Sequence, residues 1–207
     1  MKYITATAII AGGLMANAAL AAPPKGDMGK AKQIVAQVCI ACHGMDGNGT
    51  EPTNPEFPKL AGKQPEYLLK QLKDFKSGKR KSDVMSWLVA GLSSDDMANL
   101  AVYFAAQKSK PGTVKNPELV EAGKKFYDEG SPENGVPACY GCHLPNASGT
   151  EKYPHLAGQH AAYTYQQLKR FASGERENDR GLVMQSLAMR MSEQEMKAVS
   201  EYIMGMK

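Results

Sequence analysis

All four cysteines of the 207-residue chain lie in two copies of one short motif, CIACH at residues 39–43 and CYGCH at residues 139–143. In each copy two residues separate the cysteines, and a histidine follows directly. This is the attachment pattern of c-type haem. The spacing lets both sulfurs reach the two vinyl groups on one edge of the macrocycle, while the histidine presents its imidazole to the iron. The sequence therefore predicts two covalently bound haem c groups, attached through Cys39, Cys42, Cys139 and Cys142.

Three other uses of a Cys-x-x-Cys pair compete with this interpretation. A disulfide suits an exported protein but leaves the histidine after each pair unexplained. A thioredoxin-like redox pair needs a βαβ context, and no strand pattern is evident in this sequence. A zinc site needs a fourth ligand near each Cys-Cys-His set. Two copies of the motif that both end in histidine favour haem.

The histidines of the two motifs are the predicted proximal ligands of the irons. The group on the other side of each iron decides the chemistry, because an open position allows oxygen or peroxide chemistry, whereas a thioether favours electron transfer. Met85 and Met184 recur at matching positions, in the loop expected before the last helix of each copy and each eight residues before a predicted cap serine. A core-packing role is the competing interpretation, since the chain has 12 methionines. The predicted iron ligands are His43, Met85, His143 and Met184.

Two further matched pairs have other interpretations. Met97 and Met196 lie on the apolar face of the last predicted helix of each copy, so we interpret them as core residues. Tyr67 and Tyr163 also match, and they either line the haem pocket or cap the middle helix of each copy.

Three more residues lack a chemically similar partner in the other copy. His155 and His160 correspond to Lys59 and Gln64, which favours surface or loop histidines over ligands. Trp87, the only tryptophan, corresponds to a serine. A half-buried packing role is favoured for it over a place at the haem edge.

The chain is a duplicated unit. The segment of 22 residues that begins at Phe57 matches the one that begins at Tyr153 at 11 positions without gaps. A self-similar repeat of this kind indicates two copies of one structural unit. Between the copies, a polar stretch with two prolines and a glycine is typical of a linker. We expect domains at residues 22–108 and 117–207, joined by a linker at residues 109–116.

Each unit is predicted to be helical. Asp27 and Asn116 are candidate caps of the first helices, middle helices begin near Pro65 and Ala161, and Gly78 and Gly174 end them. The final helices start with serine followed three residues later by a carboxylate, at Ser93-Asp96 and Ser192-Glu195, which is the capping-box pattern. The fold class is therefore all-α, with a few short helices and long loops in each unit.

The ends and charges of the chain bear on its location and partners. Residues 1–21 predict a cleaved signal peptide, because Lys2 precedes an apolar stretch that ends in Ala19-Leu20-Ala21. An uncleaved membrane anchor is the alternative. A net charge of +4 is too small to favour nucleic acid as a partner. The basic run at residues 76–81 is either a solvated loop, which we favour, or a docking site for an acidic partner.

These motifs resemble the dihaem cytochromes of the c4 type, in which two class I cytochrome c domains stand in tandem. The resemblance rests on the two CxxCH motifs, on the stretches FPKLAG and YPHLAG, and on the methionine before each final helix. It implies that the first and last helices cross at Gly29 and at Gly123, with Tyr103 and Tyr202 as aromatic partners. It also implies that the carbonyls of Pro58 and Pro154 accept the proximal imidazole N–H groups. The second unit departs from the simplest pattern through a six-residue insertion before its motif.

The resemblance further implies a function. It predicts a periplasmic carrier of single electrons between respiratory complexes, from a quinol-oxidising complex to a cytochrome oxidase, and not an enzyme. Its partners would be redox proteins, without nucleic acid, and with peripheral membrane association left open. The alternative is a cytochrome electron-transfer subunit of a dehydrogenase, and a dihaem peroxidase is less favoured because both units carry the matched methionine.

Overall fold

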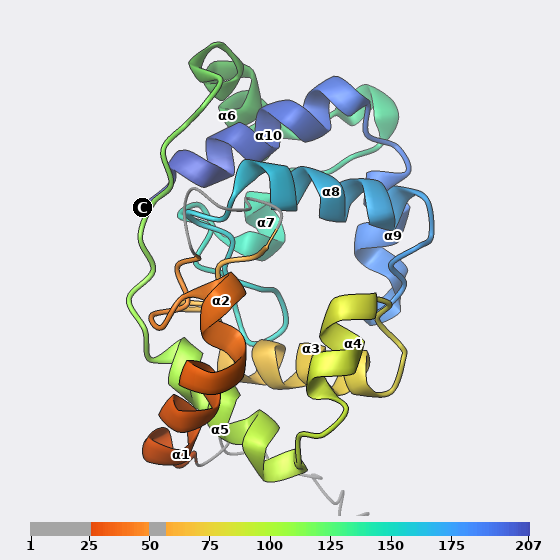
Figure 1. Cartoon of the computed structure of the whole chain (residues 1–207). Helices are drawn as coiled ribbons and strands as arrows, with labels where there is room; N and C mark the ends of the chain where they lie inside the picture. The colour runs from red at the N-terminus through yellow and green to blue at the C-terminus, as the bar shows by residue number, and fades with distance from the viewer. Residues whose placement is uncertain (1–25, 50–56) are drawn as a thin grey trace, which may run out of the picture.

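The computed structural model describes residues 26–49 and 57–207, and shows two helical lobes arranged one above the other (Figure 1). The predicted signal peptide at residues 1–21 lies outside these residues. Within them there is no β-strand, only an isolated bridge between Ser131 and Val136 in the inserted loop of the second unit. None of the helices in the described ranges has the length and apolar character to cross a bilayer.

The two lobes repeat one helix order. In the first lobe a helix runs into the first motif, and three helices follow it: α1 (Met28–Ile34), a π-helical turn (Val35–Cys39), α2 (Ile40–His43), α3 (Pro65–Lys76), α4 (Asp83–Val89) and α5 (Ser94–Ala105). The second lobe has the same series with short 3-10 turns added: Pro117–Leu119, α6 (Val120–Glu129), Pro132–Asn134, α7 (Tyr140–His143), α8 (Ala161–Ala172), Arg180–Leu182, α9 (Val183–Ala188) and α10 (Glu193–Gly205). The all-α prediction with two tandem units is therefore confirmed.

Three of the four predicted helix caps form, and the fourth is wrong: Asn116 precedes the 3-10 turn Pro117–Leu119 without a side-chain cap hydrogen bond. Asp27 accepts the backbone N–H of Lys30 at 2.9 Å. Ser93 and Asp96 make a reciprocal capping box at the start of α5, and Ser192 makes the same pair at the start of α10. Each cap satisfies N–H groups that a helix leaves without a partner at its first turn. The capped helices therefore begin at fixed residues.

The first and last helices of each lobe pack against one another, at the predicted glycine in the second lobe but not in the first. In the second lobe Gly123 is essential to the approach, because a Cβ there would lie 2.1 Å from the carbonyl oxygen of Ala198 on α10. The prediction for Gly29 is wrong: this residue is exposed, and a Cβ there would meet only the Asp27 carboxylate at 3.3 Å. The residue buried at the α1–α5 contact is Ala31, which packs with Leu100.

The lobes meet through the segments that are most alike in the two copies. Gln159 clamps the backbone of Lys59, accepting its N–H at 2.8 Å and donating to its carbonyl at 3.0 Å. Lys63, the counterpart of Gln159, donates to the carbonyl of His155 at 2.8 Å, and Gln64 accepts the N–H of His155 at 2.9 Å. The contacts are reciprocal between the copies, so the internal repeat also builds the interface.

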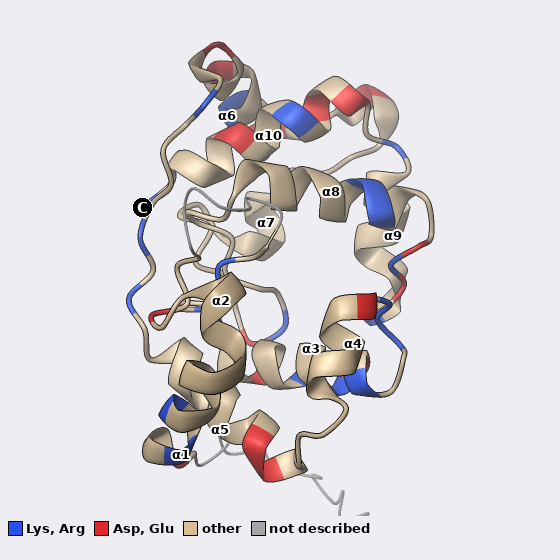
Figure 2. Ribbon diagram, in the orientation of Figure 1, with Lys and Arg blue, Asp and Glu red and all other residues tan. Residues whose placement is uncertain are grey.

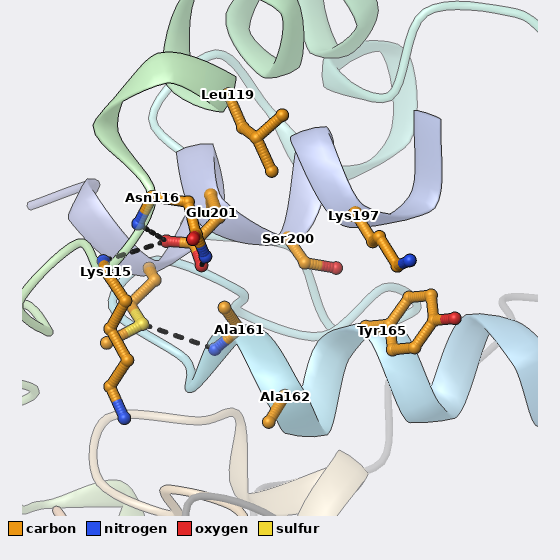
Figure 3. A pocket seen from close by; sticks show the side chains of 10 residues that line it. Lys115, Asn116, Leu119, Ala161, Ala162, Tyr165, Lys197, Ser200 and Glu201 are labelled. Carbon is orange, nitrogen blue, oxygen red and sulfur yellow. Dashed lines mark hydrogen bonds between the residues drawn. The ribbon is translucent and has the colours of Figure 1, made fainter. Parts of the chain in front are cut away.

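The linker lies against the second lobe. The N–H of Lys115 and the side-chain amide of Asn116 both bind the buried carboxylate of Glu201 on α10, the latter at 2.6 Å (Figure 3). These bonds lie beside a hollow between the linker, α8 and α10, which Ala161 and Met204 help to line. The linker is thus held in place as it passes from one lobe to the other.

Candidate haem sites

Each CxxCH motif lies on a short helix that presents its sulfurs and imidazole together. Cys39 closes the π-helical turn and His43 ends α2, while Cys139 precedes α7 and His143 ends it. The four cysteines are free thiols, each partly exposed. Burial raises the pKa of the Cys39 thiol to about 11 and that of Cys139 to about 12. No disulfide joins the cysteines of either motif, so each motif has two sulfurs available for covalent attachment.

The two motif histidines are buried and fixed by the same bond. His43 Nδ1 lies 2.9 Å from the carbonyl oxygen of Pro58, and His143 Nδ1 lies 3.0 Å from that of Pro154. Burial lowers the pKa of both imidazoles and outweighs the opposing effect of these hydrogen bonds. A neutral imidazole that donates from Nδ1 leaves Nε2 as a lone-pair ligand for a metal. The proline contacts that the family resemblance implies are present in both lobes.

An aromatic ring stands edge-on to each motif histidine. The ring centroids of His43 and Phe57 are 6.5 Å apart, and those of His143 and Tyr153 are 6.1 Å apart, both in T-shaped geometry. Phe57 and Tyr153 open the matching segments of the internal repeat. Together with the hydrogen bond from Nδ1 to the proline carbonyl, this contact restricts how the imidazole can turn.

Met85 and Met184 lie in short helices, not in the loops that we expected. Met85 is in α4, where its N–H donates to Ser82 Oγ at 3.2 Å. Met184 is in α9, where its N–H donates to Asp179 Oδ2 at 2.7 Å. Both methionines are half-buried, and Met184 packs on the same core cluster as Cys139. In each lobe the motif helix and this methionine helix lie on opposite sides (Figure 1). Met97 and Met196, by contrast, are buried in the core as predicted.

The hydroxyls of the two matched tyrosines take part in the contact between the lobes. Tyr67 and Tyr163 lie in the first turn of α3 and α8, and each accepts a hydrogen bond from the arginine of the other lobe. Arg80 Nη2 donates to the Tyr163 hydroxyl at 2.8 Å, and Arg176 Nη2 to that of Tyr67 at 3.3 Å. Sequence reasoning missed this arginine pair, whose only signal was the recurrence of one arginine after the middle helix of each copy.

The remaining expectations are partly wrong. His155 and His160 do lie outside the helices, but His160 is only 2% exposed, and His155 Nδ1 donates to the Gly62 carbonyl across the interface at 2.9 Å. Their loop is therefore part of the contact between the lobes and not free surface. Trp87 is 78% exposed, so the half-buried packing role is wrong.

Comparison with known proteins decides what these sites hold. The sequence profile of the family described as cytochrome c matches residues 29–107 and again residues 120–207. The chain is 46% identical to cytochrome c4 of Pseudomonas aeruginosa over 179 residues, which are 85% of this chain and 87% of that protein. It matches the crystal structure of reduced recombinant cytochrome c4 from Pseudomonas stutzeri with a TM-score of 0.82 and 41% identity, over 88% of this chain and 100% of that one.

The chain belongs to the cytochrome c4 family.

As a cytochrome c4 with two cytochrome c domains, it carries two covalently bound haem c groups and works in electron transfer. The residues fit this cofactor, because each lobe combines a pair of free thiols with a buried imidazole whose Nε2 is left for a metal. A further relative is the thiosulfate dehydrogenase electron acceptor of Thiomonas intermedia, 36% identical over 80% of this chain and 76% of that protein. The names of these relatives describe electron carriers and acceptors of redox proteins rather than enzymes.

Proposed function

We propose that this cytochrome c4 is a carrier of single electrons in which both irons have one histidine and one methionine ligand. The observation that supports it is the duplication of the whole arrangement. Each lobe has an imidazole fixed by a proline carbonyl and, in another short helix, a half-buried methionine. A peroxidase would need one site that differs from the other.

The residues of the chain have separate roles in this proposal. His43 and His143 would bind the irons through Nε2, while Met85 and Met184 would close the opposite positions. When bound, the haem irons supply reversible one-electron oxidation and reduction. A neutral, soft thioether raises the potential relative to a second histidine. If the chain holds one ligand on each side of the iron in both states, little of it would have to move when the charge at the site changes.

The proposal extends to the location of the protein, the limits of its domains and its partners. We place the signal peptide at residues 1–21, the domains at 22–108 and 117–207, and the mature protein in the periplasm. There it would take electrons from a quinol-oxidising complex and deliver them to a cytochrome oxidase. The apolar stretch before a small-x-small site supports export.

A second function is favoured by particular relatives. Besides the electron acceptor of Thiomonas intermedia, the chain resembles a thiosulfate dehydrogenase from Marichromatium purpuratum, with a TM-score of 0.81 at 28% identity, covering 87% of this chain but 40% of that one. The same carrier could therefore serve as the electron-transfer partner of a dehydrogenase. Purification from its own cells tests this, because a dehydrogenase subunit would co-purify with a larger catalytic chain.

The carrier proposal is tested by adding a ligand to the loaded protein. Carbon monoxide is mixed with the reduced protein, and imidazole with the oxidised protein, at neutral pH. Two closed sites predict unchanged optical spectra in both states. A change that amounts to one haem in two would show an open position and would support the peroxidase alternative instead.

A further inference from the structure

The methionine helix of the first lobe carries an unusual exposed face. Trp87 is 78% exposed and Val84, one turn before it, is 53% exposed. Single exposed apolar residues are ordinary on protein surfaces. A tryptophan is different, because burying its large ring on contact with a partner makes it a frequent anchor of protein interfaces. Here it lies two residues from Met85, on the same short helix.

Exposed cations stand beside this face. The loop between α3 and α4 contains Lys79, Arg80 and Lys81, of which both lysines are exposed and the arginine is buried. Arg80 is engaged in the interface, where it binds Gln71 and Gln167 as well as Tyr163. The two lysines therefore direct their charge to solvent, while the arginine between them serves the contact of the lobes.

The second lobe shows that the fold does not require these charges. At the same place it has Glu175, Arg176 and Glu177, with the arginine buried in the equivalent network and both carboxylates exposed. Figure 2 shows the contrast as blue ribbon beside α4 and red ribbon on the loop that precedes α9. Ser186 takes the place of Trp87. One buried arginine is thus flanked by cations in one lobe and by anions in the other.

We propose that the α4 face of the first lobe, formed by Lys79, Lys81, Val84 and Trp87, is the docking surface for a redox protein with an acidic rim around an apolar centre. This rests on the proposed carrier function. Cations at the rim attract and orient an acidic partner, and the exposed ring is buried when the partner is seated. Asp83 is the one exposed acid at the start of α4, and it is outnumbered by the two lysines. Docking here brings the partner against the helix that carries Met85.

The test uses the haem-loaded protein and two probes of opposite charge. The reduced protein is mixed in a stopped-flow instrument with the oxidised form of the acidic copper protein plastocyanin or of basic mitochondrial cytochrome c, so that one electron passes from a haem iron to the probe. The variants are Lys79→Glu/Lys81→Glu, Trp87→Ser, and the matched control Glu175→Lys/Glu177→Lys. Reactions are compared at about 0.01 M and about 1 M salt, where the Debye lengths are about 30 Å and about 3 Å.

The docking proposal predicts a selective loss. At low salt the lysine pair variant reacts with plastocyanin about tenfold more slowly than the unaltered protein, and high salt removes this difference. Trp87→Ser slows plastocyanin at both salt concentrations. The glutamate pair variant is not slowed with plastocyanin. None of the three variants changes the yield of haem reduction by ascorbate. This yield reports the carrier function without docking, so a protein that ascorbate does not reduce would count against the carrier function alone.

Two results would overturn the proposal. One is a plastocyanin rate that is unchanged in the lysine variant, or lowered equally by both charge variants. The other is that the unaltered protein binds phosphatidylglycerol vesicles, that the lysine variant and Trp87→Ser both lose this binding, and that the rates with plastocyanin are unaffected. That outcome would make the α4 face a contact for an anionic membrane surface.

Discussion

Arg80 of the first lobe donates to the hydroxyl of Tyr163 of the second at 2.8 Å, and the same guanidinium binds Gln71 of its own lobe at 2.8 Å. Its counterpart Arg176 repeats this with Gln167 and, at 3.3 Å, with Tyr67. Both arginines also stack over a phenylalanine at the end of the middle helix of their own lobe. The lobes are therefore held by two buried guanidinium groups that exchange partners across the interface.

Removal of one hydroxyl from this network should be measurable. Tyr163→Phe deletes a hydrogen bond to a buried charge, so we expect a loss of about 1.5–3 kcal/mol in the free energy of unfolding. Tyr165→Phe is the matched control, since its hydroxyl binds the exposed Glu193 and its loss should cost less than about 0.5 kcal/mol. Urea unfolding of the haem-loaded variants gives both values. Equal losses would show that the Arg80–Tyr163 bond contributes little.

The crossing of α6 and α10 gives a second prediction. Gly123→Ala places a methyl group against the Ala198 carbonyl, with 2.1 Å between the added Cβ and that oxygen, so the helices must separate. We expect a loss of about 3 kcal/mol or more, because backbone atoms cannot rotate away. Gly29→Ala in α1 is the control and should change stability by less than about 1 kcal/mol. Thermal unfolding of the two variants measures both losses, and a larger loss of stability in Gly29→Ala than in Gly123→Ala would contradict this prediction.

The backbone N–H groups of the two candidate methionine ligands bind different acceptors. The N–H of Met184 binds the carboxylate of Asp179, whereas that of Met85 binds the neutral hydroxyl of Ser82. A negative charge near an iron favours its oxidised form. Asp179→Asn should therefore raise the reduction potential of the second haem and leave the first unchanged. Potentiometric titration of the variant measures both potentials, and an unchanged pair would mean that the Asp179 charge does not reach the iron.

Asp96 gives a prediction on pH. Hydrogen bonds from the Ser93 hydroxyl and from Lys30, with the Ser93 N–H, lower the pKa of this carboxyl to about 2. A folded-state pKa below the unfolded value of about 3.9 stabilises the fold above that pH, and the effect is lost as pH falls towards 2. Asp96→Asn should therefore be less stable than the unaltered protein at pH 7 and equal to it near pH 2. A stability difference that persists at pH 2 would be inconsistent with a charge effect.

Much of the fold could be predicted because it is local. The serine caps at Ser93 and Ser192 and the glycine stops at Gly78 and Gly174 depend on neighbours within a few residues, and all of them are found. The buried prolyl contact of each motif histidine followed from family resemblance. Both features depend on short, specific sequence patterns.

The errors concern long-range packing. Gly29 and Ala31 stand two residues apart on α1, and only the crossing angle with α5 decides which one is buried. The expectation that Trp87 is half-buried is wrong, because the sequence does not show which side of α4 faces away from the core. The arginine pair was missed since its partners lie in the other lobe, more than 80 residues away. Duplication revealed which residues match, but not which of them face each other.

The ligation of the two irons is the central claim, and single substitutions test it most directly. Oxidised haem with a methionine ligand has a weak charge-transfer band at long wavelength, which would be recorded for the unaltered protein, Met85→Ala and Met184→Ala. Met97→Ala, which alters a buried core methionine, serves as the control. The account predicts that each of the first two variants loses about half of the band and that the control retains it. A variant at Met85 or Met184 that keeps the full band would show that its methionine only packs, and would contradict the account.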